Sequence, residues 1–298
     1  MRPFDYIIPK DHAEASALLA EGSGAARAFQ GGTDLLIRVR GGFIRPERVV
    51  DLKRLPGMQE IRLGKDGWLV IGAACTMNQV AIHPLVRERY DLLAQGTASV
   101  ASYQLRNRAT IGGNCCNASP AADTAPPLFC LDTIVELYGP GGVRRLPIAD
   151  FYVGPGRTAL QRGEFLTSIH LPPSPTGAQG VYNKLGRTKV GDIAVMSVAV
   201  YAWPAATQSG LTWRIALGAV GPTPLRAPEA ETALAADISP AGVVAAAQLA
   251  ADASRPIDDI RASAAYRRDM VRVLARRGIE KVLDLTGLRD LSGLGGAA

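Results

Sequence analysis

Short apolar runs typical of strands are mixed along the chain with segments that show the 3.6-residue period of amphipathic helices. The strand-type runs cover residues 26–29, 49–52, 133–138, 181–185, 193–203 and 211–220. A hairpin is predicted between residues 60 and 71, because the turn Gly64-Lys65-Asp66-Gly67 separates two apolar runs. Helical segments are predicted after the capping residue Asp11 and over residues 77–102 (with a break at Pro84), 240–254 and 263–283. This mixed order predicts an α+β fold, with residues 110–125 as a long loop.

The proline-rich segment 172–177 is the best candidate for a linker between domains. It separates a first domain, residues 1–177, from a C-terminal α+β domain, residues 178–290, and residues 291–298 are predicted to be a flexible tail. A chain of 298 residues is long enough for about two domains. The absence of a Gly-x-Gly-x-x-Gly turn in a regular βαβ rhythm argues against a Rossmann dinucleotide site.

Composition and charge narrow the class of protein. Hydrophobic residues make up 47% of the chain and charged residues 20%, which excludes a disordered chain, a collagen and a coiled coil. The net charge of +6 is compatible with an anionic partner. The densest basic cluster lies in residues 267–281, where a solvated helix face is favoured over a nucleic-acid stripe. The longest uncharged run, residues 193–213, is broken by Pro204 and Gly210, and no signal peptide is evident, so we expect a cytoplasmic protein with reduced thiols.

Two segments combine adjacent glycines with a threonine: Gln30-Gly31-Gly32-Thr33-Asp34 and Thr110-Ile111-Gly112-Gly113-Asn114. Adjacent glycines permit positive φ angles and close approach of backbone amides to a ligand. Successive amides in such a turn form a concave anion site, and the threonine hydroxyls add donors. Two such segments together would suit the two phosphates of a pyrophosphate. The simpler alternative is a pair of ordinary Gly-Gly turns.

Residues 110–123 closely resemble the flavin-binding signature of the molybdenum hydroxylases. The chain resembles, over nearly its whole length, the FAD-binding medium subunit of the carbon monoxide dehydrogenase, xanthine dehydrogenase and 4-hydroxybenzoyl-CoA reductase type. Further matching segments are residues 4–9, 30–36, 151–158, 163–166, 182–187, 192–194 and 266–268. The resemblance implies a two-lobed FAD-binding α+β domain of the PCMH type, followed by a smaller α+β domain.

The resemblance also implies the residues that bind FAD. Asp123 matches an aspartate near the adenosine ribose, although it could instead cap a helix. Lys184 matches a lysine near the flavin ring, and Leu166 a residue that meets the flavin or adenine part; a solvated lysine and a core leucine are the simpler alternatives. Leu105, together with Tyr103, is expected to line the flavin pocket or to pack on a helix face. The full predicted set is Gln30, Gly31, Gly32, Thr33, Asp34, Leu105, Thr110, Ile111, Gly112, Gly113, Asn114, Asn117, Asp123, Leu166 and Lys184.

Two departures from the family pattern affect these expectations. Gln30 stands where alanine is common, and we expect its longer side chain to point away from the flavin. The cysteine-bearing insertion of the reductase branch is missing, and adjacent Cys115 and Cys116 lack the Cys-x-x-Cys spacing of a cluster site. The four cysteines are therefore interpreted as buried or local thiols, and no metal ligand and no catalytic side chain is predicted.

The function implied is electron transfer within a larger complex. A molybdopterin-binding large subunit would oxidise the substrate, and a small subunit with two [2Fe–2S] clusters would pass electrons to FAD on this chain and on to NAD or a quinone. The complex is expected to be a dimer of heterotrimers, without nucleic acid. The alternatives are a stand-alone FAD-dependent reductase of the enolpyruvyl-sugar type and a flavin-free scaffold subunit.

Overall fold

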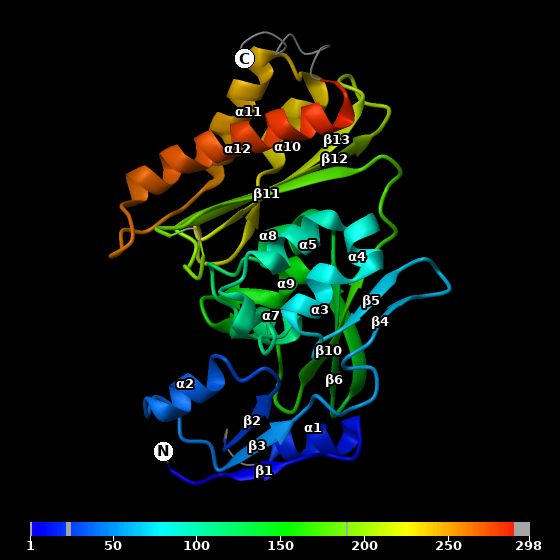
Figure 1. Cartoon of the computed structure of the whole chain (residues 1–298), viewed down its shortest axis with the longest axis vertical. Coiled ribbons are helices and arrows are strands. Elements are labelled where there is room, and N and C mark those ends of the chain that lie inside the picture. Colours follow the sequence, from blue (N-terminus) through cyan, green and yellow to red (C-terminus); the bar gives the residue numbers. More distant parts are fainter. Residues whose placement is uncertain (1, 22–24, 189, 289–298) are drawn as a thin grey trace. The chain divides into compact units, whose positions relative to one another are not determined.

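The structure, a computed structural model, describes residues 2–21, 25–188 and 190–288, which form two compact units (Figure 1). Unit 1 consists of Met1–His83, Ser102–Ala118 and Asp132–Pro173, and unit 2 of Pro84–Ala101, Ser119–Leu131 and Ser174–Ala298. Both units combine helices with sheets, so the predicted α+β class is confirmed. The predicted tail, residues 291–298, lies outside the described residues.

Unit 1 begins with a small parallel sheet. Its strands, in the order β1-β3-β2, are β1 (Asp5–Ile7), β2 (Ala26–Phe29) and β3 (Arg48–Asp51). Along the chain, α1 (His12–Ala20) lies between β1 and β2, and α2 (Leu35–Arg40) between β2 and β3. Asp11 caps α1 as predicted, because its Oδ1 accepts from the Glu14 amide at 2.8 Å. The carboxyl ends of parallel strands meet at one sheet edge, where open α/β sheets commonly bind ligands. The first glycine segment follows directly from β2 at this edge.

An antiparallel five-stranded sheet forms the larger part of unit 1. Its strands, in the order β4-β5-β10-β6-β7, are β4 (Ile61–Leu63), β5 (Leu69–Gly72), β10 (Phe165–Leu171), β6 (Ile134–Gly139) and β7 (Gly142–Pro147). The unit is completed by α3 (Met77–Ile82), α6 (Tyr103–Arg106), α7 (Ile111–Asn117), α9 (Ile148–Phe151), β8 (Tyr152–Gly154) and β9 (Arg157–Thr158). Every residue of the central strand β10 is buried, and α7 contacts this strand.

The prediction of a long loop over residues 110–125 is wrong, because α7 occupies Ile111–Asn117 and Ala125 begins another helix. Thr110 is the N-cap of α7, and its hydroxyl accepts from the Gly113 amide at 3.1 Å. Glycine is a poor helix former, by about 1 kcal/mol relative to alanine, so the sequence hides this helix. A side chain at Gly112 would come within 2.5 Å of the Ala73 Cβ. Close packing thus requires glycine inside α7.

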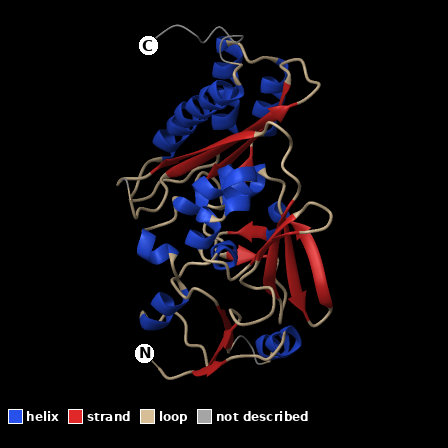
Figure 2. Cartoon of the chain, turned by 45° about the vertical axis from the view of Figure 1, so that its right-hand side comes forward, coloured by secondary structure: helices blue, strands red, loops and turns tan. Residues whose placement is uncertain are grey.

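Unit 2 is built around an antiparallel four-stranded sheet with helices on both faces (Figure 2). Its strands are β11 (Gln179–Leu185), β12 (Met196–Pro204), β13 (Leu211–Gly218) and β14 (Leu225–Arg226). One group of helices comprises α10 (Pro228–Ala236), α11 (Pro240–Ala253) and α12 (Ala264–Thr286), and the other α4 (Pro84–Arg89), α5 (Asp91–Ala98) and α8 (Ala125–Cys130). Covering both faces explains why β12 is apolar at consecutive positions rather than alternating.

The second group of helices precedes the predicted linker in the sequence but packs on the C-terminal sheet. Helix α5 contacts β11, and α8 contacts β12 and β13. Compact units therefore do not coincide with continuous stretches of sequence, and the domain boundary at residue 177 stays a prediction.

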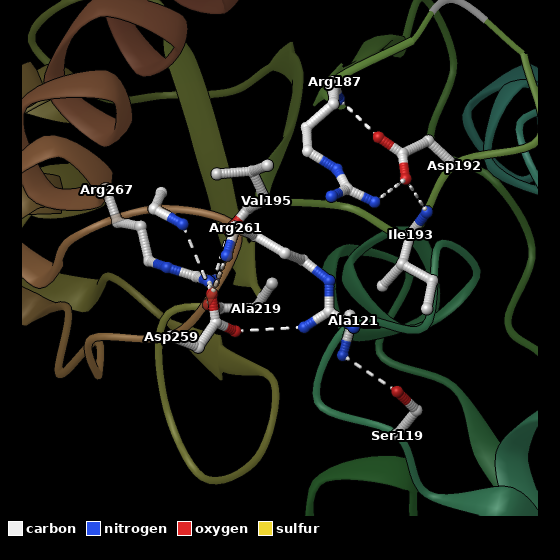
Figure 3. Close-up of polar contacts among 11 residues, drawn as sticks. Ser119, Ala121, Arg187, Asp192, Ile193, Val195, Ala219, Asp259, Arg261 and Arg267 are labelled. Carbon is white, nitrogen blue, oxygen red and sulfur yellow. Dashed lines mark hydrogen bonds and ion pairs between the residues drawn. The ribbon is translucent and has the colours of Figure 1, made fainter.

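A buried arginine fixes the loops at one end of the unit 2 sheet (Figure 3). Arg267 donates to the carbonyl oxygens of Val195, at 2.6 Å, and Ala219, at 3.1 Å, and to Asp259 Oδ1, at 2.6 Å. It is 3% exposed, so the prediction of a solvated helix face is wrong for this member of the basic cluster. Arg261 also donates to Asp259, through its amide and its guanidinium.

Replacing Asp259 with asparagine should destabilise the chain at neutral pH by roughly 1 kcal/mol, because charge-assisted hydrogen bonds are lost at a partly exposed site. The Arg261 amide and the Arg267 guanidinium hold the pKa of Asp259 at about 2. The carboxyl is stabilised by folding, so its contribution is complete above the unfolded pKa of about 3.9 and disappears as the pH falls towards 2. Urea unfolding at several pH values should show the Asp259→Asn difference shrinking on acidification.

Asp269→Asn is the matched control, because this exposed carboxylate of α12 has no hydrogen bond or ion pair among the described residues. A pH-independent difference for Asp259→Asn would contradict the proposed role of its charge.

Candidate functional site

One cavity of unit 1 is lined by both glycine segments that the sequence analysis singles out. Its volume is about 320 Å³. The lining residues are Arg27, Ala28, Gln30, Gly31, Gly32, Thr33, Asp34, Leu35, Arg38, Ile44, Leu52, Ala109, Thr110, Gly113, Asn114, Cys116, Asn117, Leu160, Glu164, Phe165 and Leu166. Segments about 80 residues apart in sequence thus share one cavity wall.

The first glycine segment presents unused backbone donors to this cavity. Gly32 has φ +74°, a conformation that glycine adopts without strain. A side chain at Gly31 would clash with the backbone of Arg108. Among the described residues, no hydrogen bond engages the amide N–H groups of residues 31–35, and none engages the Thr33 hydroxyl. A run of free amides around a left-handed residue is the geometry of an anion-binding concavity.

The second glycine segment differs, because the first amides of α7 already have protein partners. The Ile111 amide donates to Cys75 O at 3.0 Å and the Gly112 amide to Ala73 O at 2.9 Å. The amides of Gly113 and Asn114 donate to the Thr110 hydroxyl and carbonyl. The amides of Ile111 and Gly112 therefore attach α7 to the rest of the unit, and those of Gly113 and Asn114 are engaged by the N-cap, so the free amides lie in the first segment.

Two side-chain hydrogen bonds connect the segments. The Thr110 hydroxyl donates to Gln30 Oε1 at 2.9 Å, and Asn117 Nδ2 donates to Asp34 Oδ1 at 3.3 Å. The side chain of Gln30 thus lies beside α7 at the cavity wall. Each bond joins a residue of the β2–α2 connection to one of α7, so the two segments act as one structural element.

Charged side chains of both signs line the cavity. Arg27 and Arg38 lie in its wall together with the carboxylates of Asp34 and Glu164. Arg144 forms a bidentate pair with Glu164, at 2.6 and 2.7 Å, and this hydrogen bonding lowers the pKa of Glu164. The charge of Glu164 is therefore balanced by Arg144, while the Asp34 carboxylate shares the wall with the two arginines.

The structure places most of the predicted binding residues in this cavity but not all. Ile111 and Gly112 are buried in α7 and do not line it. Leu105, on α6, is 46% exposed and is not in the cavity wall. Leu166 is 1% exposed, so it is both a core residue of β10 and part of the wall. A role for any of these residues in binding FAD stays a prediction.

Asp123 and Lys184 form a buried ion pair in unit 2. Lys184 Nζ lies 2.7 Å from Asp123 Oδ2 and also donates to Ser99 O at 3.0 Å, while the Tyr182 hydroxyl donates to Asp123 Oδ1 at 2.7 Å. Burial raises the pKa of Asp123, although Lys184 and the two hydrogen bonds oppose the shift. Both ionic side chains thus have protein partners, and their predicted roles as ligands of ribose and flavin stay predictions.

Several residues of the cavity wall were not predicted from the sequence. Arg27 and Arg38 flank the first segment, and only the alternation of β2 and the turn of α2 bring them to the cavity. Phe165 and Leu160 precede Leu166 in sequence, so proximity to a predicted residue could have indicated them. Ile44 and Leu52 carry no sequence signal of their own.

The cysteines are free thiols, and three of them are buried. Burial raises the pKa of Cys75 to about 12 and that of Cys115 to about 11, so both are protonated at neutral pH. Cys116 lies in the cavity wall, and burial raises its pKa as well. Over the described residues, no group of three or more His, Cys, Asp or Glu side chains is arranged to hold a metal ion.

Comparison with known protein families covers both parts of the chain. Residues 2–174 match the FAD binding domain in molybdopterin dehydrogenase, and residues 181–282 match the CO dehydrogenase flavoprotein C-terminal domain. The matches define a flavoprotein subunit of an oxidoreductase. More narrowly, the chain belongs to the family of FAD-binding medium subunits of molybdenum hydroxylases, which confirms the resemblance seen in its sequence.

Individual relatives cover nearly the whole chain. The carbon monoxide dehydrogenase medium chain of Afipia carboxidovorans is 35% identical over 93% of this chain and 96% of its own length. The xanthine dehydrogenase FAD-binding subunit of Escherichia coli O157:H7 is 32% identical, over 92% and 94%. A carbon monoxide dehydrogenase structure from Hydrogenophaga pseudoflava matches with a TM-score of 0.90 and 33% identity, over 95% of this chain and 98% of that one.

No helix in the described part of the chain is both long enough and apolar enough to cross a membrane.

Proposed function

We propose that the unit 1 cavity binds the pyrophosphate part of FAD and that the chain transfers electrons within a molybdopterin and iron–sulfur complex. The observation that carries this proposal is the run of free amides in residues 31–35, at the wall that the two glycine segments share. An anion that accepts from these amides would replace the water they otherwise need.

The donors present suit a pyrophosphate. The amides of the first segment and the Thr33 hydroxyl supply hydrogen bonds, and Arg27 and Arg38 supply positive charge. Because the first four amides of α7 already have protein partners, we place the phosphate donors on the first segment and give α7 a supporting role. Apolar side chains of Leu166 and Phe165 line another part of the wall and exclude water there.

When bound, FAD supplies a carrier that connects one-electron iron–sulfur clusters with a two-electron acceptor. The chain's own residues bind and orient it, and no side chain needs to act as a general acid or base. The proposed donor is a small subunit with two [2Fe–2S] clusters, fed by a molybdopterin-binding large subunit in a dimer of heterotrimers. NAD or a quinone is the proposed acceptor. We also propose that the complex is located in the cytoplasm.

The complex purified from its native host should contain noncovalent FAD together with iron and molybdenum. We expect flavin and iron–sulfur absorbance in one spectrum and about one FAD released per chain on denaturation. Metal analysis and quantification of the released flavin provide the measurement.

Each other result has a distinct meaning. FAD without iron or molybdenum would support the stand-alone reductase. Lack of flavin in the complex, and failure of the isolated chain to take up added FAD, would overturn the proposed function and leave the scaffold alternative.

A further inference from the structure

The side chain of Gln30 forms the first link of a short hydrogen-bond chain at the cavity wall. The Thr110 hydroxyl donates to Gln30 Oε1 at 2.9 Å and accepts from the Gly113 amide at 3.1 Å. A hydroxyl has only one proton to donate. The Thr110 proton is therefore used by Gln30, and this hydroxyl has no second proton for a bound phosphate.

The side-chain amide nitrogen Nε2 of Gln30, unlike the Thr110 hydroxyl, still has protons to donate. Its carbonyl oxygen is fixed on Thr110, and the Nε2 group carries two protons. Among the described residues, no hydrogen bond engages Nε2. Gln30 is half-buried and belongs to the cavity wall, directly before the free amides of residues 31–35. A half-buried donor beside a run of free donors strengthens the case for an anionic acceptor.

We propose that Gln30 Nε2 donates a hydrogen bond to the pyrophosphate of FAD and that Thr110 positions the Gln30 side chain for this contact. The inference rests on the proposed function, because it requires the pyrophosphate to lie at the first glycine segment. It is compatible with the expectation that the Gln30 side chain points away from the flavin, and it gives that side chain a contact with the pyrophosphate instead. It also changes the role expected for Thr110 from sequence: the threonine of the second segment orients, and the glutamine side chain of the first segment binds.

Three substitutions separate binding from positioning. Gln30→Glu keeps an oxygen that accepts from Thr110 but removes the donor and adds a negative charge. Gln30→Met removes donor and acceptor at similar size. Thr110→Val keeps the Gln30 amide but removes the bond that positions it. Gln208→Glu makes the same chemical change at an exposed turn of unit 2 and is the matched control.

FAD affinity of the reconstituted full chain, measured by calorimetry, should fall most for Gln30→Glu, less for Gln30→Met and least for Thr110→Val. Hydrogen bonds to charged groups are worth enough that we expect Gln30→Glu to weaken binding by about tenfold to a hundredfold. Gln30→Met should weaken it by about tenfold, and Thr110→Val by a few-fold. The Gln30→Glu deficit should shrink as the pH falls from about 7 to about 4, because a carboxyl with an ordinary pKa of about 4.3 is then increasingly protonated, neutral and able to donate.

Several outcomes would overturn this inference. Binding by Gln30→Glu equal to that of the wild type would show that Nε2 contributes nothing. A larger loss for Thr110→Val than for Gln30→Met would contradict the assignment of the phosphate contact to Gln30 rather than to Thr110. A pH-independent loss for Gln30→Glu would indicate a structural effect. If the wild-type chain binds no FAD, the proposed function itself fails, which is a separate result.

Discussion

Gly32→Val should reduce the affinity of the chain for FAD by at least about a hundredfold, which corresponds to about 2.7 kcal/mol. Gly32 has φ +74°, where a β-branched residue is strongly disfavoured. A side chain there would also clash with the ring of Phe29, the last residue of β2. Relief of both strains requires the segment to move, which would displace the free amides of residues 31–35. Calorimetric titration of the flavin-free chain with FAD measures the effect.

Gly57→Val is the control, because Gly57 has φ +75° and open space around its missing side chain, outside this cavity. It shares the backbone strain of Gly32→Val but not the contact with the binding segment. We expect Gly57→Val to lower stability without changing FAD affinity. Equal FAD binding by Gly32→Val and the wild type would contradict the assignment of the first segment to the pyrophosphate.

The paired variant Gly32→Val/Gly113→Val tests the flavin role at the level of the complex. A side chain at Gly113 would come within 2.7 Å of the Thr110 hydroxyl and disturb the bond that caps α7. Unchanged activity of the assembled complex would leave the chain a scaffold rather than an electron carrier.

From the sequence, all four glycines of the two segments were predicted for one reason, the close approach of backbone amides to a ligand. The structure shows separate reasons for three of them. Gly32 needs a positive φ, while Gly31 and Gly112 need space for a neighbouring backbone. Only the first reason is local, because turn chemistry depends on adjacent residues. The other two depend on contacts with Arg108 and Ala73, far from the glycines in sequence.

Element types were easiest to predict where turn and capping residues mark the ends of an element. The hairpin at residues 60–71 and the helix after Asp11 follow from local pattern and capping, and the structure contains both. The division of the chain into units does not follow from local pattern. Helices α5 and α8 precede the linker, but the sheet they cover begins at Gln179, and only tertiary packing determines that pairing.

Lys184→Met should destabilise unit 2 by about 3 to 5 kcal/mol, because it leaves the buried carboxylate of Asp123 without its cation. The side chains of Lys184 and Asp123 are 16% and 8% exposed, so water does not replace the lost partner. Burial already raises the pKa of Asp123, and removing the lysine would raise it further. A raised folded pKa means that stability is lost as the pH rises through it. Urea unfolding should therefore show a larger cost at pH 8 than at about pH 4.

The double variant Lys184→Met/Asp123→Asn should recover most of the lost stability, since a neutral side chain at position 123 no longer needs a cation. Lys281→Met, at an exposed position of α12, controls for loss of a lysine. These measurements also separate the structural role of the pair from its predicted role as a ligand. If Lys184→Met unfolds like the wild type but binds FAD more weakly, the lysine acts on the flavin. If it loses stability while the double variant regains both stability and FAD affinity, the pair acts by holding Asp123 and Tyr182 in the core of unit 2.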